Sequence, residues 1–219
     1  MKSTVAALVF IFFSIQIFAQ DTLIVFNNYK YKVGIKLISE ESGNPSISNE
    51  TFPVYNIGVQ IIRRIKQSKF SFESGIYYTN RAFKNTYART YISGQTYFAH
   101  EPEYYHYLNI PVNIRFDTKL LYYSIGFYGE HFLFNSTEHE ENNDSAIYIG
   151  SIRKINVGVD FIIGLEKNIN TDLNFFVEAR TCNNLTSFIL EYSSRDYPSF
   201  VNYGFAIGIN YKIPNTQVK

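Results

Sequence analysis

The chain has 219 residues, a formal net charge of +1, one cysteine and no tryptophan. Its length suits one all-β domain, its near-neutral charge gives no strong field for nucleic acid, and a lone cysteine excludes an internal disulfide framework. Cys182 is therefore expected to be an inert, packed thiol.

The first twenty residues have the layout of a secretory signal peptide. Lys2 precedes a short apolar run, Val5–Phe13, and Ala19 and Gln20 end a plausible cleavage region. We assign residues 1–20 to a signal peptide and 21–219 to the mature domain, with an uncleaved anchoring helix as the alternative. No later segment reaches the roughly 18 consecutive apolar residues of a spanning helix.

Eight later segments alternate apolar and polar residues at period two, which predicts β-strands. Most have roughly ten to thirteen residues, enough for the nine to eleven or so that a tilted strand needs to cross a bilayer. A ten-strand count stays open if Thr22–Phe26 or Ser187–Tyr192 joins the sheet. The eight predicted strands are Tyr29–Leu37, Val54–Ile65, Phe70–Thr79, Tyr104–Phe116, Leu120–Phe132, Ile155–Glu166, Leu173–Cys182 and Val201–Ile213.

The connections between these strands alternate between short and long. The short ones are Lys66–Lys69, Asp117–Lys119 and Lys167–Asp172. The long ones are Ile38–Pro53, Asn80–Glu103, Leu133–Lys154 and Asn183–Phe200. Short periplasmic turns and long external loops are typical of outer-membrane barrels, which also have an even strand count.

The two faces of the predicted strands differ in composition. The polar parity is rich in Gly and Asn, and small residues suit the converging interior of a narrow barrel. The apolar parity carries aliphatic residues in mid-strand and tyrosines near the ends, like a lipid-facing band with aromatic girdles. A soluble lipocalin-like barrel is the alternative, but an eight-stranded interior cannot hold so many bulky side chains. We therefore predict an all-β, antiparallel, up-and-down transmembrane barrel of eight strands in a bacterial outer membrane.

Charges of both signs fall on the inward parity and are expected to pair across the lumen, because an unpaired buried charge is unfavourable. The predicted network comprises Lys32, Lys36, Glu73, Arg115, Asp160, Glu166, Glu178, Arg180 and Lys212. Pro111, in the middle of a predicted strand, lacks a ladder donor, so a bulge or kink is expected there.

Two stretches resemble the PorT-like outer-membrane β-barrel family. In Tyr104–Phe116 the residues Tyr107, Leu108, Ile110 and Pro111 match its Tyr-x-x-Ile/Leu-Pro strand, and Tyr203–Ile213 is similar to the closing strand of such barrels. The resemblance implies an eight-stranded outer-membrane barrel, and some members are tied to protein secretion. One departure is that Pro214–Lys219 trails where many barrels end on an aromatic residue.

The sequence predicts no catalytic site, cofactor or metal. Ser124 and His131 lie on opposite parities of one strand, so they cannot act together as nucleophile and base. His100, His106, His131 and His139 are interpreted as rim histidines. The acidic run Glu138–Asp144 lacks the spacing of a calcium loop, and Asp144–Ala146 is a weak pattern for O-glycosylation.

The predicted loop Asn80–Glu103 mixes arginines with aromatics, a composition suited to ligand or protein contact. Within it, Tyr87–Ile92 and Gln95–Phe98 are candidates for a projecting hairpin; an extended rim whose tyrosines join the interfacial belt is the alternative. The candidate contact residues are Arg81, Phe83, Tyr87, Arg89, Tyr91, Tyr97 and Phe98.

We expect a non-enzymatic barrel with loops for adhesion or partner binding. The alternatives are an accessory subunit of an envelope secretion or transport assembly and a lipid-modifying enzyme, and a narrow solute pore is open. Expected partners are outer-membrane lipids, the barrel-assembly machinery during insertion and a possible envelope protein, but no nucleic acid.

Overall fold

The computed structural model describes seven stretches of the chain. They are residues 29–43, 50–65, 68–90, 96–118, 120–137, 153–186 and 200–214. The predicted signal peptide and the candidate ninth and tenth strands lie outside the described residues. No helix within the described stretches is long and apolar enough to span a membrane.

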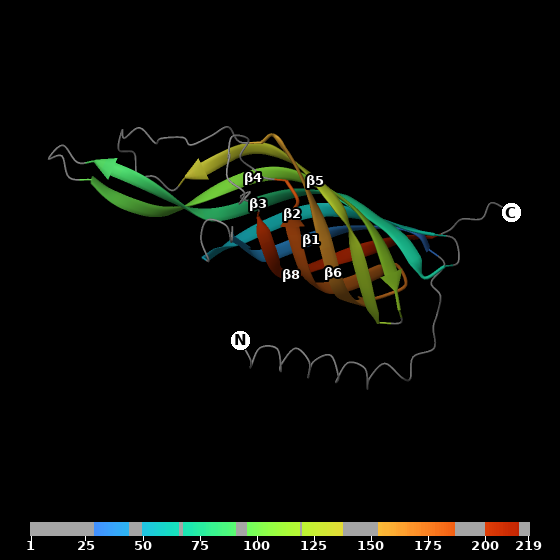
Figure 1. Ribbon diagram of the computed structural model, residues 1–219. Helices are drawn as coiled ribbons and strands as arrows, with labels where there is room; N and C mark the ends of the chain where they lie inside the picture. Colours follow the sequence, from blue (N-terminus) through green and yellow to red (C-terminus); the bar gives the residue numbers. More distant parts are fainter. Residues whose placement is uncertain are drawn as a thin grey trace.

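Eight antiparallel strands close into a barrel in which each strand pairs with its neighbours in sequence (Figure 1). The ring is completed by β8 against β1, which are in continuous register from Tyr31↔Ile213 to Gly43↔Val201. The predicted strand number and fold class are thereby confirmed. The strands are β1 (Tyr29–Gly43), β2 (Thr51–Arg64), β3 (Phe70–Thr90), β4 (Thr96–Asp117), β5 (Leu121–Thr137), β6 (Ile155–Asn168), β7 (Leu173–Asn184) and β8 (Val201–Pro214).

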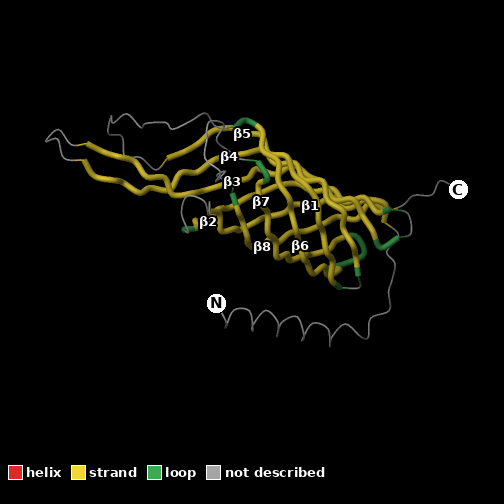
Figure 2. The backbone as a smooth tube through the Cα atoms, in the orientation of Figure 1, coloured by secondary structure: helices red, strands yellow, loops and turns green. Residues whose placement is uncertain are grey.

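Several strands extend farther than the alternation predicted. β1 continues through Ile38, Glu40 and Ser42, all buried, so the residues 38–43 belong to the sheet rather than to a loop. The predicted loop 80–103 is largely β-sheet as well, because β3 and β4 stay paired up to Thr90↔Thr96. Figure 2 shows this hairpin reaching beyond the rest of the barrel. The described parts of the predicted projecting hairpin, residues 87–90 and 96–98, are paired strands, and residues 91–95 lie outside the description.

The outer face of the barrel is a continuous apolar band. On β4 it comprises Leu108, Ile110, Val112 and Ile114, which are 38–60% exposed, and ends at Phe116. At about 3.4 Å per residue and a tilt of about 40°, that stretch spans roughly 23 Å, close to the 25 Å or so of an outer-membrane barrel's lipid-facing band. A closed barrel satisfies the backbone hydrogen bonds of its strands internally, so a barrel with an apolar outer face and a charged lumen can span the hydrocarbon core of a membrane. The protein is an outer-membrane β-barrel.

The structure has no bulge at Pro111, so that part of the expectation was wrong, although the β3–β4 pairing is interrupted there and neither Ile110 nor Pro111 has a paired residue on β3. The pairs Ser74↔Val112 and Tyr77↔Asn109 on either side of it have the same register, so β4 passes the proline without an extra residue. The Ser74 hydroxyl donates to the Pro111 carbonyl at 2.7 Å and supports the strand there. A register shift lies instead between His106 and Tyr107, where β4 pairs with β5.

Candidate functional site

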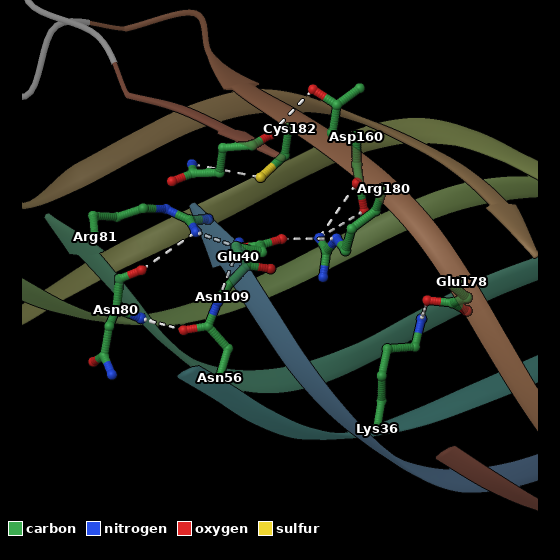
Figure 3. A network of polar contacts seen from close by, with 12 residues as sticks. Lys36, Glu40, Asn56, Asn80, Arg81, Asn109, Asp160, Glu178, Arg180 and Cys182 are labelled. Atoms are coloured by element: carbon green, nitrogen blue, oxygen red, sulfur yellow. Dashed lines mark hydrogen bonds and ion pairs between the residues drawn. The ribbon is translucent and has the colours of Figure 1, made fainter. Parts of the chain in front are cut away.

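The outer part of the lumen holds a chain of ion pairs centred on Glu40 of β1. Arg81 bridges Glu40 and Glu130, with its Nη1 3.2 Å from the Glu40 carboxylate. Arg180 approaches the same carboxylate at 3.1 Å and also pairs with Asp160 at 3.2 Å. Figure 3 shows Glu40, Arg81, Asp160 and Arg180 pointing toward one another from four different strands. Each charge there has a partner of opposite sign, which offsets the loss of hydration.

The middle of the lumen is organised around Lys36. Its ammonium group lies 3.1 Å from Glu73 and 2.9 Å from Glu178, and all three side chains are nearly inaccessible to solvent. The Tyr122 hydroxyl donates to Glu178 at 2.6 Å. One cation therefore holds together two carboxylates from β3 and β7.

The inner part of the lumen, beside the short turns, contains a third cluster. Glu166 pairs with both Lys32 and Arg115, and Arg115 also reaches Asp117 at 2.7 Å. The Arg115 guanidinium lies 3.5 Å from the centre of the Tyr122 ring, a cation–π contact that joins this cluster to the middle one.

All nine residues of the predicted lumen network face the inside of the barrel. Eight of them form ion pairs among themselves or with Glu40 and Asp117, whereas Lys212 bonds to Asn168 at 2.7 Å and to the Thr171 carbonyl. Sequence reasoning missed Glu40, Arg81 and Glu130. Glu40 and Arg81 lie beyond the predicted strand ends. Glu130 lies two residues after the lumen-facing Tyr128, so the alternation of that strand could have placed it in the lumen.

Glycines on the inward face make room for large rings. Tyr122 lies against Gly164, and Tyr128 lies against Gly158; a Cβ built on either glycine would be about 2.1–2.2 Å from the ring. Phe176 covers Gly208 and Tyr77 covers Gly58 in the same way. These rings and the charged clusters fill the lumen with side chains, as expected for eight strands.

A shallow depression lies on the lipid side, over β1, β7 and β8. Ile35, Leu173, Phe175 and Ile209 contribute to its lining, and none of its lining residues is charged. It offers contact with acyl chains and no polar chemistry.

The candidate contact residues of the projecting hairpin have mixed outcomes. Arg81, expected in an exposed loop, instead lies buried in the lumen, because the alternation of β3 continues past Thr79 and directs it inward. Phe83, Tyr87, Arg89, Tyr97 and Phe98 lie on the paired strands, but their side chains are outside the description, as is the whole of Tyr91.

Ser124 and His131 lie on opposite faces of β5, as the alternation predicted. Ser124 is buried in the lumen, whereas His131 faces outward and is exposed. His106 also faces outward, at the outer margin of the apolar band. The acidic run, the modification pattern and His139 lie outside the described residues. Among the described residues, no group of His, Cys, Asp or Glu side chains is arranged to hold a metal ion.

Comparison with solved structures finds small outer-membrane barrels. Neisserial surface protein A is 10% identical, with a TM-score of 0.49 over 84% of this chain and 97% of that one. Ail of Yersinia pestis, in complex with the heparin analogue sucrose octasulfate, is 10% identical with a TM-score of 0.43 over 84% and 97%. The outer-membrane protein AlkL is 10% identical with a TM-score of 0.39 over 90% and 96%. These likenesses are weak, and the strand pairing and apolar band of this chain establish the barrel without them.

No family model and no curated protein sequence matches the chain. The PorT-like resemblance therefore stays a prediction.

Proposed function

We propose that the protein anchors a binding arm in the outer membrane, the arm being the outer part of the β3–β4 hairpin. Its occupant is the surface of another cell, bound outside the hydrocarbon region. The observation that carries this proposal is the length of the hairpin.

The arm comprises the seven residue pairs from Lys84↔Pro102 to Thr90↔Thr96. Among the described residues, β2 pairs with β3 only as far as Tyr78, and β5 pairs with β4 only as far as Glu103. At about 3.4 Å per residue, the two-stranded arm is roughly 24 Å long. Both of its edges are unpaired within the described sheet, and unpaired edges are templates for strand addition by a partner.

The filled lumen supports binding rather than transport. Lys36, Arg81 and Arg115 are each at most 2% exposed and are held by carboxylates on facing strands. Passage of a solute would separate buried ion pairs, and that is strongly unfavourable.

Replacing residues 84–102 by Asn-Gly tests the proposal. Phe83 and Glu103 are paired, and Asn-Gly forms a two-residue hairpin turn between paired residues. We expect the shortened protein to keep its heat-modifiable gel mobility while cells that display it lose adhesion to surfaces bound by cells with the full chain. Equal adhesion by both would contradict the proposal. A second variant keeps the full length of the arm but replaces its aromatic side chains by Thr at Phe83, Tyr87, Tyr97 and Phe98. It tests whether adhesion needs these aromatic side chains or only the length of the arm.

The alternative, an accessory subunit of an envelope assembly, predicts a different result. Purification of the full chain from native membranes in mild detergent would then retain an envelope protein in fixed stoichiometry, and the shortened variant would lose it.

A further inference from the structure

A hydrogen-bonded chain of three side chains crosses the outer face of the barrel at its outer margin. Ser136 Oγ lies 2.8 Å from His106 Nε2, and His106 Nδ1 lies 2.6 Å from Asn80 Oδ1. The three residues come from β5, β4 and β3, and Asn80 is paired directly with His106 in the sheet. A hydroxyl, an imidazole and an orienting acceptor in this order form the arrangement that activates a serine nucleophile.

The contacts of Asn80 fix the tautomer of the imidazole. Its side-chain amide donates through Nδ2 to the Tyr55 carbonyl at 2.9 Å, which turns Oδ1 toward His106. Since Oδ1 only accepts hydrogen bonds, His106 Nδ1 carries the proton. Nε2 is then an unprotonated acceptor for the Ser136 hydroxyl, as a general base requires.

The ring plane of His106 is held by two aromatic neighbours. Phe134 stacks on it at 4.3 Å between ring centres, and Tyr78 stacks at 5.7 Å. The Tyr78 hydroxyl oxygen also lies 2.6 Å from Nδ1 and shares its proton. The imidazole is thus oriented before any ligand arrives.

The register shift in β5 places Ser136 on the outer face. Up to Glu130, the even-numbered residues of β5 face the lumen, as Tyr122, Ser124 and Tyr128 do. His106 pairs with Phe134 but Tyr107 pairs with Phe132, so Leu133 is an extra residue. Beyond it the even-numbered residues face outward, with Phe134 50% exposed and Ser136 exposed. Bulges of this kind re-aim side chains and are frequent next to active sites.

The position along β4 indicates the substrate. His106 is the next outward residue beyond Leu108, the outermost residue of the apolar band on that strand. A group there meets the boundary between acyl chains and headgroups, where the ester bonds of membrane lipids lie. No soluble substrate has to be captured, because the ester diffuses to the site within the membrane.

We propose that Ser136, His106 and Asn80 form an ester-hydrolysing site for acyl chains of outer-leaflet lipids. Ser136 Oγ attacks the ester carbonyl carbon as its proton passes to His106 Nε2. The bond from that carbon to the alkoxy oxygen breaks, and the alcohol leaves with the proton. Water then attacks the acyl-serine, with His106 accepting one proton and returning it to Ser136, and a fatty acid is released. Asn80 is a positioning residue that orients His106.

This inference goes beyond the binding role of the hairpin and is independent of it. It departs from the leading sequence-based prediction, a non-enzymatic barrel, and takes up the alternative of a lipid-modifying enzyme. Both ester-linked phospholipid and lipid A supply the required chemistry, so the two are tested separately.

The full chain, refolded in detergent and checked by heat-modifiable mobility, is tested first with a fluorophosphonate probe. We expect covalent labelling that Ser136→Ala abolishes and Ser74→Ala, a matched serine on the lipid-facing parity of β3, preserves. Fatty acid release is then measured in mixed micelles of dioleoyl phosphatidylcholine and, separately, of purified lipid A. Release from either, reduced about 10³-fold or more in Ser136→Ala, supports the site and identifies the lipid class. No release from either, or equal release by the Ser136→Ala variant, would overturn it.

The positioning role of Asn80 has its own test. Asn80→Ala is expected to lower kcat, by up to about 10⁴-fold, whereas Asn80→Asp, which keeps an acceptor oxygen toward Nδ1, restores most of it. A purely structural role for Asn80 predicts no such rescue. Deletion of Leu133 returns Ser136 to the lumen-facing parity, and it must abolish labelling while the heat-modifiable mobility is retained; labelling that persists in this folded variant would refute the arrangement.

Discussion

The lumen and the outer margin of β3, β4 and β5 follow different rules. In the lumen, each charged or aromatic side chain is where strict alternation puts it, and the contacts are ion pairs between facing strands. At the outer margin, one extra residue in β5 breaks the alternation and brings Ser136 beside His106. Regular pairing therefore builds a rigid, filled anchor, and the departure from it assembles side chains capable of chemistry.

The largest loss of stability is expected when the central cation of the lumen is removed. Lys36→Met leaves Glu73 and Glu178 without the ammonium group that lies about 3 Å from both. We expect the free energy of unfolding in lipid vesicles to fall by about 3–5 kcal/mol, because two carboxylates lose a buried partner. Arg63→Met, which removes an exposed cation at the end of β2, serves as the control and is expected to change stability by less than about 0.5 kcal/mol.

A loss of less than about 1 kcal/mol in Lys36→Met would mean that water or another cation reaches the two carboxylates, and the filled lumen would be contradicted. Adding Glu73→Gln and Glu178→Gln to Lys36→Met should recover part of the loss.

Charged substitutions on the lipid-facing surface are expected to cause the next largest loss of stability. Val112 is 60% exposed in the middle of the β4 band, and Leu108 is at its outer edge. Val112→Arg is expected to lower the free energy of unfolding by about 2–4 kcal/mol, whereas Leu108→Arg lowers it by about 0–1 kcal/mol, because the unfavourable transfer of a charge declines toward the interface. Equal losses at both depths, measured by denaturant titration in vesicles, would contradict the placement of the band.

The smallest expected effect concerns the glycine recesses. In Gly164→Ala the new methyl group would meet the Tyr122 ring at 2.1 Å, so the ring must shift away from Glu178 and Arg115. Overpacking of this kind lowers stability by about 1–3 kcal/mol. Gly129→Ala is the matched control, because its methyl group has nothing within 4 Å; a loss as large as that of Gly164→Ala would show that the effect is not steric.

The sequence was sufficient for the strand number and for the two faces, because a pleated strand alternates strictly and lipid selects one parity for apolar residues. Glu40 and Arg81 were missed because polar residues at the outer strand ends look like loop, although the alternation runs on through Ile38 to Ser42. Nothing in composition distinguishes an Arg that turns into the lumen from one in an exposed loop.

The bulge was missed for a different reason. A single inserted residue inverts the parity of everything after it, and its signal here is the run Phe132, Leu133 and Phe134, three apolar residues in a strand that otherwise alternates. A proline in mid-strand is the more familiar signal for a bulge, but the strand that contains Pro111 stays in register. Ser136, His106 and Asn80 are separated by 26 and 30 positions along the chain and are joined only by the pairing of three strands.

Because the chain has no tryptophan, a single introduced tryptophan reports on its own surroundings. This allows the most direct test of which face of each strand contacts lipid. Phe127 and Tyr128 are neighbours on β5, 60% and 2% exposed, so Phe127→Trp and Tyr128→Trp place one fluorophore on either face of the same strand. In vesicles containing lipids brominated along the acyl chain, the tryptophan of Phe127→Trp should be strongly quenched and that of Tyr128→Trp should be unaffected. Equal quenching of both, or quenching of the second alone, would contradict a barrel whose apolar face contacts lipid and whose charged face lines the lumen.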